Sequence, residues 1–283
     1  MKTTRACQTA ILSALLVTPL ALHAKGEVAD AAIAAQRAAL QQNTAGQGFG
    51  PQSPRDIDSP AGSNTRVFST APRASALNLC NIHFHRSAEH RGGEFTTYAG
   101  NGDGNGYGSG YQYDGELDAD ERAPVSAPVC AGDHGALSPG DTIEVHYVHS
   151  SAQVTPGPTL GACLDDAIKN PQLRVETLVL VLVNDDNAAD FTRLAAVGQK
   201  DGYHQALNLP EGEDAVEYAG STTGPGYNET GSPFQVTWRV RPDVVKADIR
   251  SVGKWCQDNV FEESGAHGVR NLVRNPALLA PIP

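Results

Sequence analysis

Short apolar runs, separated by stretches rich in Gly, Pro, Asn and Asp, mark four strands in this chain. They lie at residues 78–86, 143–149, 175–183 and 234–241. In the first two runs, polar side chains recur at alternate positions, which is typical of strands whose two faces meet different surroundings. The third run contains Glu-Thr-Leu-Val-Leu-Val-Leu-Val and does not alternate, so it predicts a strand that is buried on both faces.

Helical patterns are few. Residues 25–43 are rich in alanine with few helix breakers, which predicts a short helix. Residues 44–75 are rich in Gly, Pro, Ser, Asn and Gln, and predict an extended arm over the domain. Two further helices are predicted at 188–197 and 243–258. We find no internal repeat in the sequence.

The first 24 residues resemble a secretory signal peptide. Lys2 and Arg5 precede a mostly apolar stretch from residue 10 to residue 22, and the small residue Ala24 ends the segment. Leu22 lies three positions before the expected cleavage site, where a small residue is usual, so the exact cleavage position stays open. No other segment approaches about 18 uninterrupted apolar residues. We therefore expect a mature chain without a membrane span, in the periplasm or secreted.

The length and charge of the chain narrow its class. About 260 mature residues suit one large domain or two small ones. The net charge of −11 argues against a nucleic-acid partner and against adhesion to acidic membranes. The charge says little more about partners, since such a charge usually reflects a solvated surface, and the oligomeric state stays open.

The cysteines predict disulfides. Cys7 leaves with the signal peptide, and four cysteines remain in a chain bound for an oxidising compartment. Two bridges among them are plausible, and spacing does not choose among the three possible pairings. The four are Cys80, Cys130, Cys163 and Cys256.

The first histidine motif lies on the strand at 78–86. Successive side chains of a strand point to opposite faces, so His83 and His85 project together. Ile82 and Phe84 then pack on the other face. Such a pair is also found as an ordinary surface or core pair, so the motif alone does not establish a site.

A second motif strengthens the first. Glu144 and His146 share a face of the strand at 143–149, and bringing the two strands together gives three converging imidazoles. Three protein ligands and an open fourth position are typical of a catalytic zinc site. His149 falls on the opposite strand face, where a packed or hydrogen-bonding histidine is expected rather than a fourth ligand.

At these residues the chain resembles a carbonic anhydrase. The segment 83–90, His-Phe-His-Arg-Ser-Ala-Glu-His, is similar to the His-x-His…Glu-His element of the α-class. The segment 144–149 is similar to the strand that supplies the third ligand of that class. A third match, at 218–225, is followed by Val-Thr-Trp at 236–238. Three matches in the same order are more specific than any one of them.

The differences between this sequence and the α-class pattern indicate a resemblance to the δ-class. The interval from His90 to Glu144 is far longer than in the α-class and contains a glycine-rich segment at 100–110. This insert is similar to the δ-class enzymes of marine algae and bacteria. The resemblance covers residues 76–283, which it implies to be the catalytic domain. The implied fold is mainly β, a single domain around a large twisted, mostly antiparallel sheet with a few short helices, preceded by the helix and arm at 25–75.

The resemblance implies zinc as cofactor and the reversible hydration of CO2 to bicarbonate and a proton through zinc-bound hydroxide. The implied ligands are His83, His85 and His146. In carbonic anhydrases generally, the pKa of the bound water is about 7. Asn81 shares the strand face of His83 and is expected to hold that ring's other nitrogen. Glu144 is expected to do the same for His146.

A gate for the hydroxide is also implied. In the α-class, a threonine and a glutamate orient the hydroxide, and Glu89 matches the glutamate. Thr223 matches the threonine, because an ungapped comparison from Tyr218 places Pro225 on a family proline. Thr222 takes this place if one residue has been deleted, and a simple turn is the alternative for the segment.

The substrate pocket should be apolar, because CO2 has neither charge nor dipole. Val148 and Trp238 match residues of the family pocket, and both would otherwise be ordinary core residues. The histidine that passes protons to buffer cannot be ranked from sequence. The candidates are His90, His134, His149 and His204.

Two other functions fit part of the pattern. A cupin would use the His-x-His-x-x-x-Glu segment with Glu89 as a fourth metal ligand, but does not require the Ser-Thr-Thr-Gly-Pro segment. A carbonic-anhydrase-like binding module would lack one or more ligand histidines, and here all three are present.

Overall fold

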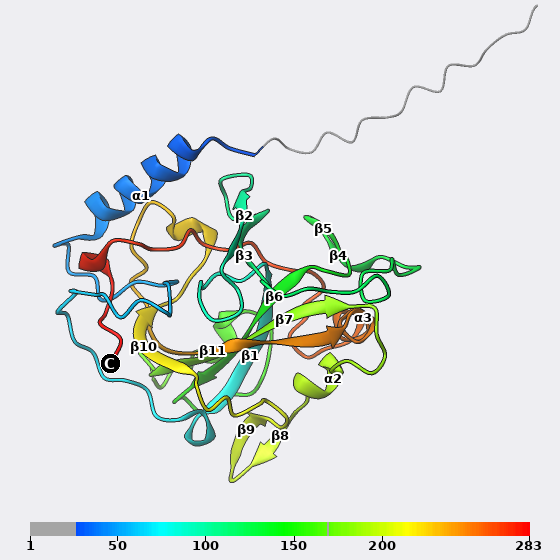
Figure 1. Ribbon diagram of the computed structural model, residues 1–283. Coiled ribbons are helices and arrows are strands. Elements are labelled where there is room, and N and C mark those ends of the chain that lie inside the picture. The colour runs from blue at the N-terminus through cyan, green and yellow to red at the C-terminus, as the bar shows by residue number, and fades with distance from the viewer. Residues whose placement is uncertain (1–26, 169) are drawn as a thin grey trace, which may run out of the picture.

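A five-stranded sheet forms the centre of the protein in the computed structural model, which describes residues 27–168 and 170–283 (Figure 1). The strands lie in the order β1 (Asn78–Arg86), β6 (Thr142–Ser150), β7 (Leu173–Val183), β11 (Gln235–Asp248) and β10 (Val216–Ser221). The mainly β fold and the four predicted strands are confirmed. The signal peptide expected at residues 1–24 lies outside the described residues.

The pairing of β1 with β6 brings the two histidine motifs together. All neighbouring strands of the sheet are antiparallel except β7 and β11, which are parallel. In the β1–β6 register, His83 lies opposite His146 and His85 lies opposite Glu144. Directly opposed residues share a face of the sheet, so all four side chains project from the same face.

The smaller elements surround the central sheet. Among the described residues they are the two-stranded sheets β2 (Thr97–Asn101) with β3 (Ser109–Gln112), β4 (Val129–Gly132) with β5 (Gly135–Leu137) and β8 (Val197–Lys200) with β9 (Tyr203–Ala206), the helices α1 (Asp30–Thr44), α2 (Phe191–Leu194) and α3 (Ile249–Gln257), and the 3-10 turns η1 (Ala74–Ala76), η2 (Leu160–Cys163), η3 (Pro225–Tyr227) and η4 (Pro276–Leu278). None of the helices in these ranges is long and apolar enough to span a membrane.

The helix predicted at 243–258 begins later in the structure, at Ile249. Strand β11 continues to Asp248, because the β-branched Val244 and its neighbours resume pairing with β7 after an irregularity in the register. The Asp248 side chain then accepts a hydrogen bond from the backbone N–H of Arg250 and caps α3. The helix proper is Ile249–Gln257.

The other predicted helices differ in extent. The helix expected at 188–197 is reduced to the four residues of α2, whereas the one expected at 25–43 corresponds to α1. In Figure 1, α1 lies near the C-terminal segment, and Arg37 Nε donates to Leu272 O at 3.3 Å. The division into arm and catalytic domain stays a prediction.

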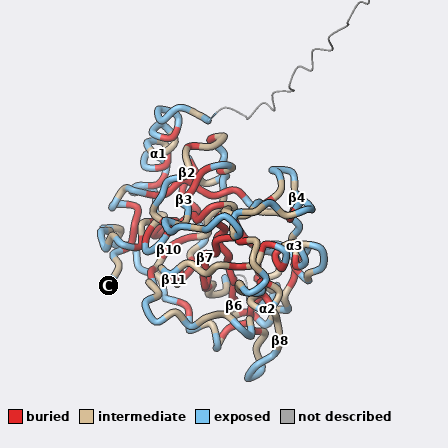
Figure 2. Tube along the Cα trace, turned by 45° about the vertical axis from the view of Figure 1, so that its right-hand side comes forward, coloured by how far each residue is buried: buried red, intermediate tan, exposed pale blue. Residues whose placement is uncertain are grey.

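Two apolar clusters cover opposite faces of the sheet, and β7 contributes to both. Leu178 and Leu180 belong to one cluster, together with Trp255 of α3. Val175 and Val179 belong to the other. Strand β7 is buried along almost its whole length, as predicted, and Figure 2 shows the buried strands enclosed by exposed loops.

Two disulfides are formed, and one of them joins the central sheet to a peripheral turn. Cys80 of β1 is bonded to Cys163 of η2, and Cys130 of β4 is bonded to Cys256 of α3. The prediction of two bridges is confirmed, and the structure selects one of the three pairings. The first bridge lies on the ligand strand, three residues before His83.

Candidate metal centre

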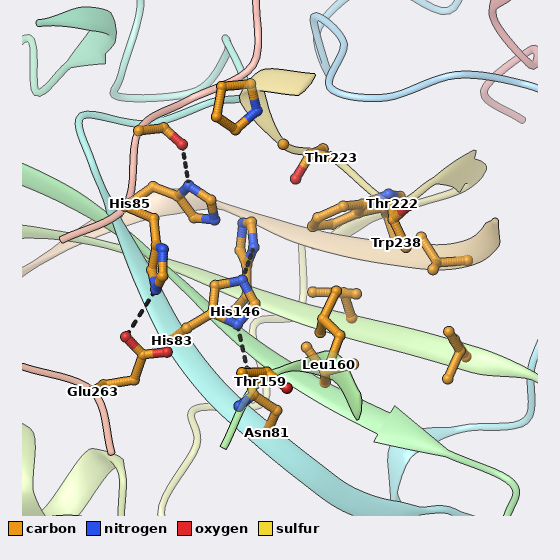
Figure 3. Close-up of a pocket in the computed structure, with 18 of the residues that line it drawn as sticks. Asn81, His83, His85, His146, Thr159, Leu160, Thr222, Thr223, Trp238 and Glu263 are labelled. Carbon is orange, nitrogen blue, oxygen red and sulfur yellow. Dashed lines mark hydrogen bonds and ion pairs between the residues drawn. The ribbon is translucent and has the colours of Figure 1, made fainter. Parts of the chain in front are cut away.

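Three histidine side chains meet on one face of the sheet. His83 and His85 project from β1, and His146 projects from β6. The ring centroids of His83 lie 5.2 Å from His85 and 5.0 Å from His146, and those of His85 and His146 are 4.6 Å apart. One nitrogen from each ring lies within 4.8 Å of the others. Figure 3 shows the three rings grouped at one end of a cavity.

Carbonyl oxygens fix the two rings on β1. His83 Nδ1 donates to Asn81 Oδ1 at 2.6 Å, and Asn81 Nδ2 donates to Gly157 O at 3.1 Å. His85 Nδ1 donates to Gly268 O at 2.8 Å. Because a carbonyl oxygen only accepts, both Nδ1 atoms carry the proton and both Nε2 atoms keep a free lone pair.

Glu144 fixes His146 through the opposite nitrogen. His146 Nε2 donates to Glu144 Oε1 at 2.7 Å, and its Nδ1 lies 3.3 Å from His83 Nε2. Glu144 also accepts from the backbone N–H and the Nδ1 of His90, at 3.0 and 2.7 Å. Burial opposes ionisation, but the charge of His90 and the bonds from both histidines hold the pKa of Glu144 well below its usual value. Glu144 is therefore a buried, oriented anion.

The three inward nitrogens fit a zinc ion. His85 Nε2 is buried without a hydrogen-bond partner among the described residues. Burial lowers the pKa of His85 to about 4, and burial followed by the charge of His146 lowers that of His83 well below its usual value. Neutral rings with a free lone pair are the form that binds metal. Two Nε2 atoms and one Nδ1 atom supply three ligands and leave a fourth position open.

Glu89 lies behind the histidines, not among their inward nitrogens. Its Oε1 accepts from the backbone N–H of Arg270 at 3.0 Å and lies 3.7 Å from His85 Nδ1. Its Oε2 lies 3.8 Å from His146 Nε2 and is buried without a hydrogen-bond partner in the described chain. Glu89, Glu144 and His146 form a second group that could hold a metal, but the Glu144 oxygens there already accept hydrogen bonds from histidines.

The two candidate threonines differ in their hydrogen bonds. Both line the cavity, and Figure 3 shows them across from the histidine rings. The Thr222 hydroxyl is bonded to Ser232 Oγ at 2.6 Å. The Thr223 hydroxyl has no hydrogen bond to any residue of 27–168 or 170–283, so the contact expected between Thr223 and Glu89 is not formed.

The cavity beside the histidines has an apolar wall. Its volume is about 280 Å³, and Val148 and Trp238 both line it. The Trp238 ring lies 4.9 Å from that of His146, and its Nε1 donates to Ser221 O at 2.9 Å. The other apolar side chains of this wall are Leu160, Leu173, Val175, Pro225 and Val236.

A family model described as delta carbonic anhydrase matches residues 74–251. The chain belongs to the delta carbonic anhydrase family. The resemblance of the strand motifs and of the long insert between them is thereby confirmed.

The chain is also similar to solved structures, at low identity. An α-carbonic anhydrase from Thermovibrio ammonificans, in complex with the inhibitor sulfanilamide, is 15% identical, with 78% of this chain and 84% of that chain covered and a TM-score of 0.28. The α-carbonic anhydrase of Photobacterium profundum is 17% identical, with 80% and 88% covered and a TM-score of 0.26. These TM-scores are too low to support an inference about function. No curated protein sequence matches the chain.

The sequence pattern did not predict His267, which also lines the cavity. His267 Nε2 donates to Glu263 Oε2 at 2.8 Å, and this bond raises the pKa of His267 against the effect of burial. The ring centroid lies 5.6 Å from that of His83. A histidine four residues after a glutamate is a weak signal in sequence. Two backbone bonds, from His267 N to Phe84 O and from Arg86 N to His267 O, place it beside β1.

The glycine-rich insert at 100–110 lies beside the site. Gly106 has φ +111°, and its O accepts from Val269 N at 2.8 Å, so that a side chain at this position would collide with Val269. The next residue, Tyr107, lines the cavity and stacks on His134 with centroids 3.3 Å apart. The insert therefore forms part of the cavity wall.

The predicted shuttle candidates occupy different environments. Both ring nitrogens of His90 are bonded, to Glu144 and to the Tyr218 hydroxyl at 2.6 Å, and the residue is fully buried. His134 stacks on Tyr107 beside the cavity, whereas His204 does not line it. The remaining candidate, His149, projects from the opposite face of β6, as predicted.

We expect His149 to make the protein sensitive to acid. Burial lowers its pKa from 6.5 to about 4, so the unfolded chain binds one more proton than the folded chain between these two values. The free energy of unfolding should fall as the pH drops below about 6.5 and level off near pH 4, by about 3 kcal/mol for this residue.

The measurement is urea unfolding at pH 7 and pH 4.5, on the parent protein and on His149→Gln. Other buried histidines titrate in both proteins, so the difference between the two pH responses isolates His149. Equal losses of stability in parent and variant would contradict the prediction that His149 causes the sensitivity to acid.

Proposed function

We propose that this delta carbonic anhydrase family member is an active zinc enzyme that interconverts CO2 and bicarbonate. One observation carries the proposal. His83, His85 and His146 each donate their outward N–H to a fixed acceptor, and each leaves its other nitrogen beside those of its neighbours. Packing of the three rings alone would not require their unprotonated nitrogens to lie close together, whereas binding of a metal ion does.

The ligand histidines would act through their orientation. Zinc bound by three neutral histidines is a Lewis acid that makes water acidic enough to serve as a nucleophile at neutral pH. Asn81 and the Gly268 carbonyl keep His83 and His85 in the tautomer with Nε2 free. Glu144 keeps His146 with Nδ1 free. Outer partners of this kind typically change metal affinity or activity about 10- to 100-fold.

Glu89 and Thr223 are proposed to orient the attacking group. Within residues 27–168 and 170–283, neither the buried Glu89 Oε2 nor the Thr223 hydroxyl has a hydrogen-bond partner. The proposal requires these two groups to come together in the active enzyme, since the contact is not formed in this structure. The hydroxyl would then donate to the carboxylate and present its lone pair toward the cavity, where it can accept one proton. Thr222 is less suited, because its hydroxyl is already hydrogen-bonded to Ser232 Oγ.

The apolar wall is proposed to receive CO2. Val148 and Trp238 offer no hydrogen-bond donor to the cavity, since the indole N–H is bonded to Ser221 O. An uncharged, nonpolar substrate loses little hydration on entering such a site. Bicarbonate, which is charged and strongly hydrated, would leave it readily.

The contacts of Glu89 weigh against the cupin alternative. In a cupin, Glu89 would be a fourth ligand on the same side as the three free nitrogens. Here its oxygens lie nearest His85 Nδ1 and His146 Nε2, the two outward nitrogens. The presence of all three histidines likewise removes the main support for a non-catalytic binding module.

A location outside the cytoplasm is part of the proposal. Two disulfides are compatible with an oxidising compartment, and the signal-peptide pattern of the first 24 residues predicts export. The partner is then inorganic carbon at the cell surface or in the periplasm.

The first test is stopped-flow CO2 hydration by the mature protein, with metal content measured on the same sample. We expect one zinc per chain and hydration that is lost on chelation and restored by zinc. A protein that holds zinc and leaves the rate of CO2 hydration unchanged would exclude the proposed activity.

The gate is tested by Glu89→Gln, which we expect to retain zinc and to slow hydration about 100-fold, because the amide no longer accepts the threonine proton as a carboxylate does. Thr223→Val should slow hydration similarly, and Thr222→Val is the matched control with little effect. If Thr222→Val gave the larger loss, the threonine assignment would be reversed. Zinc loss from Glu89→Gln would instead favour Glu89 as a ligand.

A further inference from the structure

A second cavity lies on the opposite face of the same sheet. Side chains alternate along β6 and β7, so His149 and Arg174 project away from the face that carries His146 and Val148. The cavity has a volume of about 540 Å³, and β11, η1 and the β8–β9 hairpin complete its wall. Its cationic lining residues are Arg73, Arg174, Lys200, Arg239 and Arg241, and its carboxylates are Glu176, Glu211 and Glu217.

Three guanidinium groups share one buried carboxylate at the base of this cavity. Glu176 accepts from Arg174 Nε at 2.7 Å, from Arg239 Nη1 at 3.2 Å and from Arg241 Nη2 at 2.9 Å. Glu217, whose side chain is 48% exposed, takes a further bond from Arg174 at 2.6 Å. Glu211 also lines the cavity, so the three arginines are matched in number by three carboxylates.

Two more cations flank the cavity without partners of their own. The side chains of Arg73 and Lys200 are exposed, and neither makes a hydrogen bond or ion pair within the described part of the chain. The protein as a whole carries a net charge of −11. A local excess of cations in such a chain favours an anion at this place.

His149 adds a hydrogen-bond acceptor to these donors. Its Nδ1 donates to Tyr147 O at 3.0 Å, which places the proton on Nδ1 and a free lone pair on Nε2. Burial lowers the pKa of His149 to about 4, so the ring is neutral at neutral pH. His149 is 1% exposed and lines the cavity, and its Nε2 has no hydrogen-bond partner among the residues described.

We propose that this cavity is a second binding site, for a small oxyanion of single negative charge that also carries a hydroxyl. The Arg174 guanidinium would bind the anionic oxygens, because its Nη1 has no partner among the described residues. His149 Nε2 would accept from the hydroxyl. Bicarbonate has this chemistry, and so has monobasic phosphate. The site is separate from the metal centre and does not depend on catalysis.

The test is calorimetric titration of the intact zinc-loaded protein, in chloride-free buffer at constant ionic strength. The probes are sodium bicarbonate, sodium acetate and sodium phosphate. Acetate has the charge of bicarbonate without its hydroxyl, and phosphate at pH 8 is mainly dianionic. CO2 hydration and the unfolding temperature, measured on every variant, control for folding and for the metal face.

We expect bicarbonate to bind more tightly than acetate or phosphate. Arg73→Gln combined with Lys200→Gln should weaken both bicarbonate and acetate about three- to tenfold, because two cations are removed. His149→Phe should weaken bicarbonate about fivefold and leave acetate unchanged, because only the hydroxyl loses its partner.

Other outcomes would overturn the proposal. Bicarbonate binding that all these variants leave unchanged would place the anion elsewhere, such as the metal centre. An equal effect of His149→Phe on bicarbonate and acetate would exclude the hydroxyl contact. Tighter binding of phosphate than of bicarbonate at pH 8 would exclude a site for a single negative charge.

Discussion

Replacing His146 with alanine should remove zinc and reduce CO2 hydration by at least about 10³-fold. The substitution leaves two ligands on β1, and it also leaves the buried Glu144 carboxylate without the N–H donor that lies 2.7 Å away. Both effects lower metal affinity. The measurement is zinc per chain after dialysis, together with stopped-flow hydration.

The matched control is His204→Ala. His204 is half-buried in β9, does not line the metal-site cavity, and its side chain makes no hydrogen bond to a described residue. This variant should keep zinc and activity. A His146→Ala protein that retains zinc and full activity would show that the metal lies elsewhere, and added zinc that restores the variant would indicate weakened rather than abolished binding.

Removing the Cys80–Cys163 disulfide, as a double alanine variant, should lower both stability and zinc affinity. The bridge closes a separation of 83 residues, and loss of a native disulfide of this kind lowers the free energy of unfolding by about 2–5 kcal/mol. It also secures the segment whose Gly157 O accepts from Asn81, the partner of His83. Zinc affinity should therefore fall about tenfold.

The second disulfide provides the control. Cys130–Cys256 closes a longer separation, 126 residues, and joins β4 to α3. Its removal should lower the free energy of unfolding by a similar amount, with zinc affinity unchanged. The two effects are measured by urea unfolding and by competition with a zinc chelator. Equal loss of zinc affinity from both variants would mean that general destabilisation, and not the position of Asn81, is responsible.

Much of the site follows from sequence because strand geometry is local. Alternation alone places His83, His85 and Asn81 on one face of a strand, and places Glu144 and His146 on one face of another. The structure pairs these strands in the register that brings His83 opposite His146. The hydrogen bonds of Asn81 and Glu144 to their histidines were predictable for the same reason.

The remaining contacts are not local, and so the sequence pattern did not predict them. The acceptor for His85 is the backbone carbonyl of Gly268, 183 residues away, and a carbonyl has no signature in sequence. His267 and Glu263 carry no motif that relates them to β1. The helix expected from 243 began late because pairing with β7 outweighed helix propensity in that segment.

The distance along the chain between His85 and Gly268 has a consequence for biosynthesis. A chain is synthesised from its N-terminus, so the strands that carry the three histidines are made long before the segment that supplies Gly268 O and the Arg270 N–H. Until that last segment docks, His85 lacks its tautomer-fixing acceptor and Glu89 lacks its donor. The orientation of the histidines is therefore completed only after almost the whole chain has been made, so a metal ion that binds earlier meets a site without these two contacts.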